Sequence, residues 1–276
     1  MKTSAEGATL YVVATPIGNL GDMTLRAIDV LRAVPLVAAE DTRMTRRVWA
    51  RHGIATKLVS YHGQSPVSRR DALLAHLDSG ADLAVVTDAG TPLVSDPGED
   101  LVTAWAARGG QVVPIPGASA VLAALVASGL PVARFAFEGF LPRRGVERRA
   151  RLAAICSDDH TTAVFEAPGR AAGTLKDLAA TCGSERRAAL CRELTKLHED
   201  IWRGTLGELE QRAATAPPRG EVTIVIAGAV VSDPGPSMSI EAGRAEVARL
   251  AREGMSRSSA AREVATRTRL PRRELY

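Results

Sequence analysis

The chain has 276 residues, of which 46% are hydrophobic and 4% aromatic, and its formal net charge is +4. This length suffices for two α/β domains and a small appendage, and the hydrophobic content argues against a disordered protein. Three cysteines and five histidines without metal-ligand spacing argue against a disulfide framework or a metal site, and favour a reducing cytoplasm. No apolar run reaches the ~18 residues of a membrane span, so no membrane partner is expected.

Five short apolar runs in the first half of the chain are predicted as strands, over residues 10–14, 36–39, 57–60, 83–87 and 111–114. Between these strands, apolar residues at helical spacing predict helices over residues 24–33, from the loop after residue 43 to residue 52, and over 69–77, 99–108 and 119–126. Thr24 can cap the first of these helices. Strands that alternate with helices predict a parallel α/β domain of about five strands. We place this N-terminal domain at residues 1–130.

A second α/β domain is expected after the break at Gly129-Leu130-Pro131, at residues 131–231. Its predicted strands are residues 135–140, 161–166, 189–195 and 221–227, with helices after residue 170 and over 206–213. Residues 232–237 are rich in proline and glycine and are predicted as a linker. Beyond the linker, residues 241–253 and 256–266 are two predicted helices broken at Gly254, which gives a helix-turn-helix shape to a module at residues 239–276.

Charge is concentrated in this C-terminal module, where nine arginines stand against five glutamates. This surplus of positive charge equals the net charge of the whole chain, so the basic and acidic residues before residue 239 are equal in number. A neutral body with a basic tail suggests that the tail meets a polyanion, although a solvated arginine-rich terminus would have the same composition.

The stretch 85–98, Val-Val-Thr-Asp-Ala-Gly-Thr-Pro-Leu-Val-Ser-Asp-Pro-Gly, ends a predicted strand and precedes a predicted helix. That order puts the loop at the carboxyl edge of a parallel sheet, where open α/β folds bind ligands. Gly90 lets a ligand approach the backbone closely, and the prolines hold the loop in shape. Residues 15–22 and 116–120 form similar loops. Together they suit a compact polar organic cofactor, because no P-loop, dinucleotide or nucleophile-elbow motif is present.

Seven motifs, in this order and spacing, carry a family resemblance: 14–22 (ATPIGNLGD), 39–43 (AEDTR), 87–98 (TDAGTPLVSDPG), 116–120 (PGASA), 139–142 (GFLP), 166–168 (EAP) and 192–196 (RELTK). From about residue 10 to 228 the chain resembles the ribosomal RNA small subunit methyltransferase I family, the 16S rRNA (cytidine 2′-O)-methyltransferases of the tetrapyrrole-methylase superfamily. The C-terminal residues resemble that family's helix-turn-helix module. The resemblance implies an α/β fold with two α/β domains of tetrapyrrole-methylase type, a cofactor cleft between them and a small C-terminal helical module.

The resemblance also implies S-adenosylmethionine as the methyl donor, bound in that cleft. The residues that it assigns to the cofactor are Pro16, Ile17, Gly18, Asp88, Gly90, Thr91, Pro92, Val94, Ser119 and Ala120. Where the superfamily turn carries an aspartate this chain has Thr91, and Asp88 is the expected source of the carboxylate. The residues agree with a sulfonium cofactor, which tolerates no close cation, because these loops contain no lysine or arginine.

Methyl transfer to a ribose hydroxyl is an in-line displacement, which depends on positioning and on help with the hydroxyl proton. The candidates for that help are Glu40, Asp41, Arg43, Arg192, Glu193 and Lys196. We assign catalytic roles to Lys196, Glu193, Asp41 and Arg43, with Lys196 as base or electrostatic stabiliser oriented by Glu193. A salt-bridged structural role is the alternative for each of them.

The expected function is 2′-O-methylation of a cytidine in 16S rRNA of the assembled 30S subunit, at the decoding centre, by a cytoplasmic homodimer. Because aromatic residues are few, RNA contact is expected through phosphate, by Arg143, Arg144, Arg148, Arg149, Arg257 and Arg262. Two alternatives remain. A small-molecule tetrapyrrole methylase would have no use for these arginines, and a non-enzymatic helix-turn-helix regulator would bind duplex DNA and transfer no methyl group.

Overall fold

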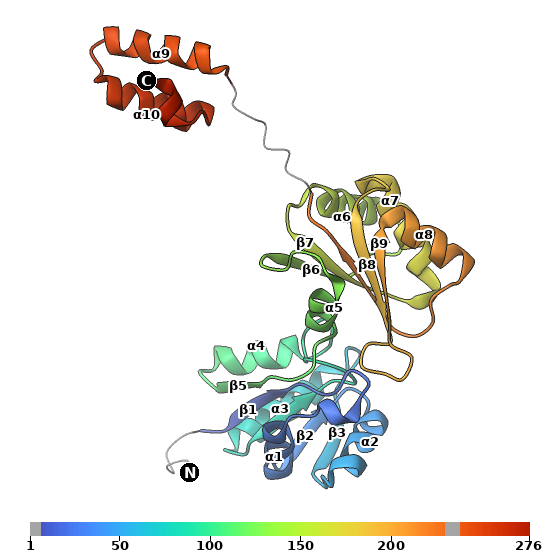
Figure 1. Cartoon of the computed structure of the whole chain (residues 1–276). Helices are drawn as coiled ribbons and strands as arrows, with labels where there is room; N and C mark the ends of the chain where they lie inside the picture. The colour runs from blue at the N-terminus through green and yellow to red at the C-terminus, as the bar shows by residue number, and fades with distance from the viewer. Residues whose placement is uncertain (1–6, 230–237) are drawn as a thin grey trace. The chain divides into compact units, whose positions relative to one another are not determined.

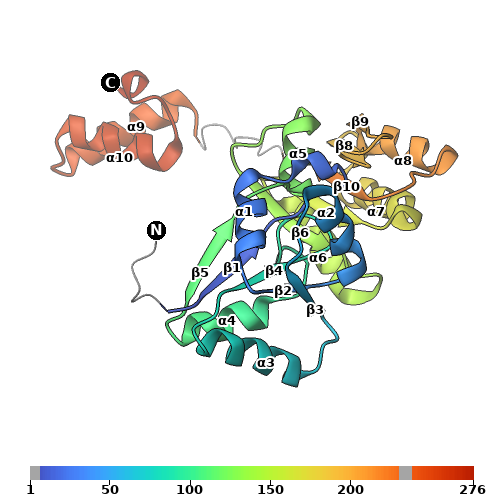
Figure 2. The same cartoon turned by 90° about the horizontal axis from the view of Figure 1, so that it is seen from below.

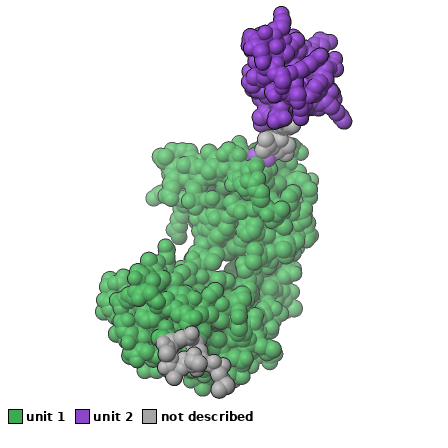
Figure 3. Space-filling view, turned by 90° about the vertical axis from the view of Figure 1, so that its left-hand side faces the viewer, with its two compact units in different colours: residues 1–228 green, residues 229–276 purple. Residues whose placement is uncertain are grey.

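The computed structural model describes residues 7–229 and 238–276. The chain forms two compact units, residues 1–228 and residues 229–276 (Figure 3). The predicted linker at residues 232–237 lies outside the described residues. None of the described helices is long and apolar enough to cross a membrane.

The first unit contains two five-stranded sheets (Figure 1). The first sheet is entirely parallel, and its strands lie in the order β3-β2-β4-β1-β5. They are β1 (Thr9–Val13), β2 (Leu36–Ala39), β3 (Lys57–Ser60), β4 (Leu83–Val86) and β5 (Gln111–Ile115). The central β4 is buried along its whole length, as expected for an apolar strand covered on both faces. The predicted parallel arrangement of about five strands is confirmed.

Four helices cover the two faces of this sheet (Figure 2). They are α1 (Leu25–Ala33), α2 (Thr42–His52), α3 (Val67–Asp78) and α4 (Glu99–Ala107). α1 and α2 pack against one face around Leu31 and Trp49, whereas α3 and α4 pack against the other around Leu77 and Trp105. Thr24 caps α1 as predicted, since its side chain accepts a hydrogen bond from the Ala27 N–H at 3.1 Å.

The second sheet is mixed, with the strand order β6-β7-β10-β8-β9. Its strands are β6 (Phe135–Phe140), β7 (Thr161–Glu166), β8 (Arg187–Arg192), β9 (Asp200–Thr205) and β10 (Val222–Ile226). β6 and β7 run parallel, and the other neighbours are antiparallel. The sequence prediction missed β9, and with it the β8–β9 hairpin, because the segment Asp-Ile-Trp-Arg-Gly-Thr is not an apolar run.

Helices also cover both faces of the second sheet. α6 (Gly145–Ser157), α7 (Ala171–Cys182) and α8 (Leu206–Thr215) pack on one face around Leu175 and Leu190. α5 (Ala120–Ser128) follows β5 of the first sheet but packs on the other face of the second, through Val121, Ala124 and Leu125. The last loop of the first sheet is therefore tied to the second sheet. The domain boundary at residue 130 stays a prediction, since both sheets belong to one compact unit.

The second unit is a small helical module with its own core. It contains α9 (Ile240–Arg252), α10 (Arg257–Thr268) and a short 3-10 helix (Arg272–Leu275). Val247, Val264 and Leu270 are buried among them. Gly254, at a φ of 101°, takes the left-handed conformation that commonly follows a helix end. Two helices joined by a short turn thus lie where the sequence predicts them.

Candidate active site

The first sheet changes its winding direction between β1 and β4. The chain leaves β1 for β2 on one side of the sheet order, whereas it leaves β4 for β5 on the other. Open α/β sheets bind ligands in the crevice that forms at such a point, at the carboxyl ends of the strands. The loops after β1 and β4 are joined at this point by two backbone hydrogen bonds. The Thr15 N–H donates to the Gly90 carbonyl at 2.8 Å, and the Gly90 N–H donates to the Thr15 carbonyl at 3.1 Å.

Gly90 brings the backbone of this bridge close to its neighbours. Its φ of 84° lies in the left-handed region, which favours glycine. A Cβ at this position would lie 3.4 Å from Ile17 Cγ2 and 3.8 Å from the Ala118 carbonyl oxygen. These are ordinary van der Waals distances, so it is the backbone conformation that favours glycine here, and the neighbours of Gly90 belong to the loops after β1 and β5.

A cavity of about 630 Å³ is lined by these loops of the first sheet, by strands β6, β7 and β10 of the second sheet and by the turn after β8. We call it the donor cavity, and its size suits an organic cofactor. Eight residues assigned to the site from sequence line it: Ile17, Gly90, Thr91, Val94, Ser119, Ala120, Glu193 and Lys196. Six other assigned residues are not among its lining: Pro16, Gly18, Asp88, Pro92, Asp41 and Arg43.

Asp88 and Asp41 connect the loops of the first sheet. The Asp88 carboxylate accepts a hydrogen bond from the Asp41 N–H at 3.0 Å, which joins the loop after β4 to the start of α2. Asp41 caps α2 and pairs with Arg43, whose Nη2 lies 2.6 Å from Asp41 Oδ2. Hydrogen bonds from Arg43 lower the pKa of Asp41 to about 2. This geometry favours the salt-bridged structural role for Asp41 and Arg43 over a catalytic one.

Lys196 reaches the donor cavity from the turn between β8 and β9. Glu193 and Thr195 in this turn have φ values of 51° and 67°, a conformation that costs free energy in residues with side chains. Lys196 Nζ lies 3.0 Å from Glu193 Oε1 and 3.2 Å from Glu221 Oε2. Partial burial lowers the pKa of Lys196, but the two carboxylates outweigh it and the net shift is upward. Lys196 is therefore a cation at neutral pH, which supports an electrostatic role and not that of a base.

The first loop of the first sheet contacts this turn directly. The Asn19 N–H donates a hydrogen bond to Thr195 Oγ1 at 3.1 Å. A Cβ on Gly18 would lie 2.4 Å from Lys196 Cγ, so the lysine side chain lies across the Gly18 backbone. Although Gly18 is absent from the cavity lining, its lack of a side chain leaves room for Lys196.

The lining of the donor cavity fits a cationic organic cofactor. Its charged groups are four carboxylates and one ammonium: Asp96, Glu166, Glu193, Glu221 and Lys196. Because the ammonium is already paired, a sulfonium in the cavity would meet no unpaired cation. Phe140 and Phe165, whose ring centroids lie 5.6 Å apart, add apolar surface of the kind that an aromatic base requires.

Asp96 is a cavity residue to which the sequence analysis gave no role. Burial, together with the nearby carboxylates Glu40 and Asp88, raises the pKa of Asp96 to about 6. A carboxylate inside a ligand loop, in the run Ser95-Asp96-Pro97, was the signal that could have identified it.

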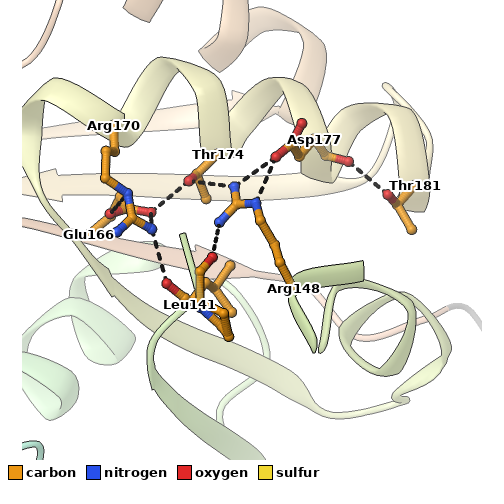
Figure 4. A network of polar contacts seen from close by, with 8 residues as sticks. Leu141, Arg148, Glu166, Arg170, Thr174, Asp177 and Thr181 are labelled. Carbon is orange, nitrogen blue, oxygen red and sulfur yellow. Dashed lines mark hydrogen bonds and ion pairs between the residues drawn. The ribbon is translucent and has the colours of Figure 1, made fainter. Parts of the chain in front are cut away.

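Glu166 is a second such residue, and it is held by a buried network (Figure 4). Its carboxylate accepts hydrogen bonds from Thr174 Oγ1 at 2.6 Å and from Arg170 Nη2 at 3.1 Å. Arg148 extends the network, since it donates to Thr174 at 3.0 Å and to Asp177 at 2.7 Å. The Glu166 carboxylate is thereby held in place at the end of β7.

The same network corrects one RNA-binding assignment. Arg148 is only 8% exposed, and four of the five N–H groups of its guanidinium donate to Asp177, Thr174 and the Pro142 carbonyl. The residue is therefore committed to the protein interior and is not placed to bind a phosphate. The other assigned arginines are exposed: Arg143, Arg144, Arg149, Arg257 and Arg262.

Asp158, Asp159 and His160 form a group that could hold a metal ion, because their ligand atoms lie within 4.8 Å of one another. His160 Nδ1 lies 2.5 Å from Asp158 Oδ1, and Arg134 Nη1 lies 3.3 Å from Asp159 Oδ2. The group precedes β7 and none of its members lines the donor cavity. Within the group, His160 Nδ1 contacts both aspartates.

Residues 9–210 match the family model of Tetrapyrrole (Corrin/Porphyrin) Methylases. The chain belongs to the tetrapyrrole methylase family. Within that family it is 47% identical to ribosomal RNA small subunit methyltransferase I of Synechocystis sp., over 97% of this chain and 95% of that protein. It is 44% identical to the Xylella fastidiosa protein of the same name, over 97% of each chain. The chain is therefore a methyltransferase of the ribosomal RNA small subunit methyltransferase I family.

Two solved structures of this methyltransferase fold also match, with lower sequence identity. Uroporphyrin-III C-methyl transferase from Thermus thermophilus, in complex with S-adenosyl homocysteine, matches with a TM-score of 0.58 and 21% identity, covering 80% of this chain and 97% of that one. Cobalt precorrin-4 methyltransferase matches with a TM-score of 0.60 and 17% identity, covering 79% and 94%. These likenesses confirm the two-sheet α/β fold of tetrapyrrole methylases.

Proposed function

We propose that this methyltransferase transfers a methyl group to the 2′-oxygen of a cytidine ribose in 16S rRNA, at the decoding centre of the small ribosomal subunit. The observation that carries the proposal is the match, along nearly the whole chain, to relatives named ribosomal RNA small subunit methyltransferase I. S-adenosylmethionine is the methyl donor, in keeping with the family and with the anionic lining of the donor cavity.

In an in-line displacement, the residues around the donor cavity would have different roles. When bound, S-adenosylmethionine supplies a methyl group on a positively charged sulfur. The loops of Gly90 and Ser119 would hold it through small side chains and backbone groups, with Val94 and Ala120 against its adenine. Negative charge that develops on the ribose oxygen would be stabilised by the Lys196 ammonium, which Glu193 holds in place at 3.0 Å.

Contact with RNA is proposed to be electrostatic. Arg143, Arg144 and Arg149 are exposed at the start of α6, and Arg257 and Arg262 are exposed on α10. Neither Arg257 nor Arg262 makes an ion pair within the described part of the chain. We expect these side chains to bind phosphates, and we expect the substrate to be an assembled 30S particle in the cytoplasm. A homodimer is expected, and a light-scattering mass equal to the 29.1 kDa monomer would count against it.

The direct test offers tritiated S-adenosylmethionine with undermethylated 30S subunits, with naked 16S rRNA or with a tetrapyrrole precursor. Label in rRNA at a cytidine that has become resistant to alkaline cleavage would establish 2′-O-methylation. Label in the tetrapyrrole alone would assign the chain to the small-molecule methylases. Binding of duplex DNA without any methyl transfer would favour a regulator.

A further inference from the structure

All four phenylalanines of this chain lie on two neighbouring strands of the second sheet. Phe135, Phe137 and Phe140 belong to the edge strand β6, and Phe165 belongs to β7. Three of the rings are in contact, since the centroid of Phe165 lies 4.9 Å from that of Phe137 and 5.6 Å from that of Phe140. A chain with few aromatic residues thus concentrates its phenylalanines at one edge of a sheet.

Phe140 is the member of this group that is both exposed and part of the donor cavity. It is 56% exposed, and it lines the cavity together with Phe165. Phe135 is 43% exposed but is not among the lining residues. A single exposed phenylalanine needs no ligand to explain it. A ring that is exposed and also lines a cavity lies at the mouth of that cavity, where a substrate must pass the methyl donor.

The backbone of β6 is irregular just before Phe140. The pairing of β6 with β7 shifts its register between Phe137 and Phe140, and Gly139 in this interval has a φ of 60°. Such an irregularity re-aims a side chain relative to regular strand alternation, and it is common next to functional sites. A Cβ on Gly139 would lie 3.1 Å from Ser95 Oγ, so this part of β6 lies against the ligand loop after β4.

Arginines hold the backbone on both sides of Phe140. On one side, Arg151 Nη2 donates a hydrogen bond to the Glu138 carbonyl at 3.1 Å. On the other side, Arg170 Nη2 donates to the Leu141 carbonyl at 3.0 Å, and the Leu141 side chain is buried (Figure 4). A ring on a backbone that is already fixed loses little further freedom when a ligand covers it, which favours binding.

The segment that follows Phe140 is basic. Arg143 and Arg144 are exposed, and neither makes an ion pair within the described part of the chain. Guanidinium groups bind phosphates, and an aromatic ring stacks on the flat face of a nucleic-acid base. An exposed ring with free cations beside it therefore suits a single unstacked nucleotide of an RNA chain.

We propose that Phe140 stacks on the base of the nucleotide whose ribose is methylated, and thereby holds that nucleotide at the mouth of the donor cavity. The inference rests on the proposed function and adds one stacking contact to the phosphate contacts proposed above. A base that leaves its own stack loses stacking energy, and an aromatic side chain restores part of it. The contact positions the ribose oxygen for in-line attack on the donor methyl group. Because every base has a face that can stack, the contact does not by itself select cytidine.

The first test measures methylation of undermethylated 30S subunits with tritiated S-adenosylmethionine. Phe140→Ala and Phe140→Leu should lower kcat/KM for the subunit by about 10–100-fold, since leucine is apolar but offers no ring face. Phe140→Trp should keep at least about a third of the wild-type value. The Kd for S-adenosylmethionine, measured by calorimetry, should stay within about threefold in all three variants. Phe135→Ala removes the exposed phenylalanine of β6 outside the donor cavity and is the matched control, with kcat/KM unchanged.

A second test locates the base directly. The chain is prepared with the photoreactive p-benzoylphenylalanine in place of Phe140, bound to undermethylated 30S subunits and irradiated. Reverse transcription should stop at the cytidine that the wild-type chain methylates. The same replacement of Phe135 should give no stop at that nucleotide.

Three results would overturn the assignment of Phe140. One is a Phe140→Ala chain whose kcat/KM stays within about threefold of wild type. Another is Phe140→Leu as active as Phe140→Trp, because the ring face would then be irrelevant. The third is a loss of cofactor affinity in proportion to kcat/KM, with no crosslink at the methylated cytidine, since the ring would then cover the cofactor. A wild-type chain that labels no rRNA would instead overturn the proposed function.

Discussion

Replacing Lys196 by alanine is the sharpest test of how this chain stabilises charge in its transition state. The ammonium lies in the donor cavity and is held by Glu193 at 3.0 Å and by Glu221 at 3.2 Å. Its pKa is shifted above the usual 10.5, so it remains protonated through the working range and loses its charge only at strongly basic pH. Lys196→Ala therefore removes a positive charge at neutral pH, not a proton acceptor.

The size of the effect follows from the surroundings of Lys196. Removing one fully enclosed donor to a developing oxyanion costs about 10²–10³ in rate. The Lys196 side chain is 27% exposed and two carboxylates offset its charge. Its electrostatic stabilisation of a developing oxyanion should therefore be weaker than that of a fully enclosed donor. We expect a loss of about 10–100-fold, or about 1.4–2.7 kcal/mol of barrier. Glu193→Gln should cost less, because Glu221 would still hold the ammonium.

The assay is single-turnover methylation of undermethylated 30S subunits, with cofactor affinity measured separately. Lys176→Ala removes an exposed lysine of α7 and is the matched control, with an unchanged rate expected. Lys196→Arg keeps the charge and should retain most of the rate. If Lys196→Ala stays within about threefold of wild type, below ~1 kcal/mol of barrier, the electrostatic role is wrong and the ion pairs only hold the turn.

Three further changes probe the core, the site and the tail. Arg148→Ala should lower the free energy of unfolding, measured in urea, by about 2–3 kcal/mol, which is less than for a fully buried ion pair because the Asp177 side chain is 47% exposed. The control Arg149→Ala should change it by less than ~0.5 kcal/mol. Equal effects of the two substitutions would contradict a structural role for the Arg148 network. Because the pKa of Asp96 is about 6 in the folded chain against an ordinary 3.8, ionising it lowers stability as pH rises through that window. The free energy of unfolding of Asp96→Asn should therefore exceed that of wild type by about 1–2 kcal/mol at pH 7.5, after allowance for partial exposure, and the two should be equal near pH 4. A stability difference that does not vary with pH would refute this. Deleting residues 237–276 should weaken 30S binding and flatten its salt dependence by ~0.7–0.9 per lost phosphate contact in log affinity against log salt, with cofactor affinity unchanged; loss of cofactor binding would show that the tail belongs to the site.

The periodic spacing of apolar residues predicts most strands and helices of this fold, but it does not predict contacts between residues that are distant in the chain. β6 and β7 lie at their predicted bounds because phenylalanines recur along β6 and because β-branched and aromatic residues dominate β7. Arg148 lies four residues before Leu152 and seven before Ile155, on the buried stripe of α6, and this helical spacing indicates a structural role and not RNA binding. An arginine on an apolar stripe indicates an acidic partner on a neighbouring element, here Asp177 of α7.

The roles within the site depend on strand register, which no local pattern contains. Lys196 and Glu193 are close in the chain, but Glu221 joins them only because β10 pairs antiparallel with β8, with Val222 opposite Arg192. That pairing puts a second carboxylate on the Lys196 ammonium, and both carboxylates raise the pKa of Lys196. Sequence alone therefore left Lys196 open as base or stabiliser. The second carboxylate adds to the upward shift of the Lys196 pKa, and this contact between two distant segments is what favours the electrostatic role over that of a base.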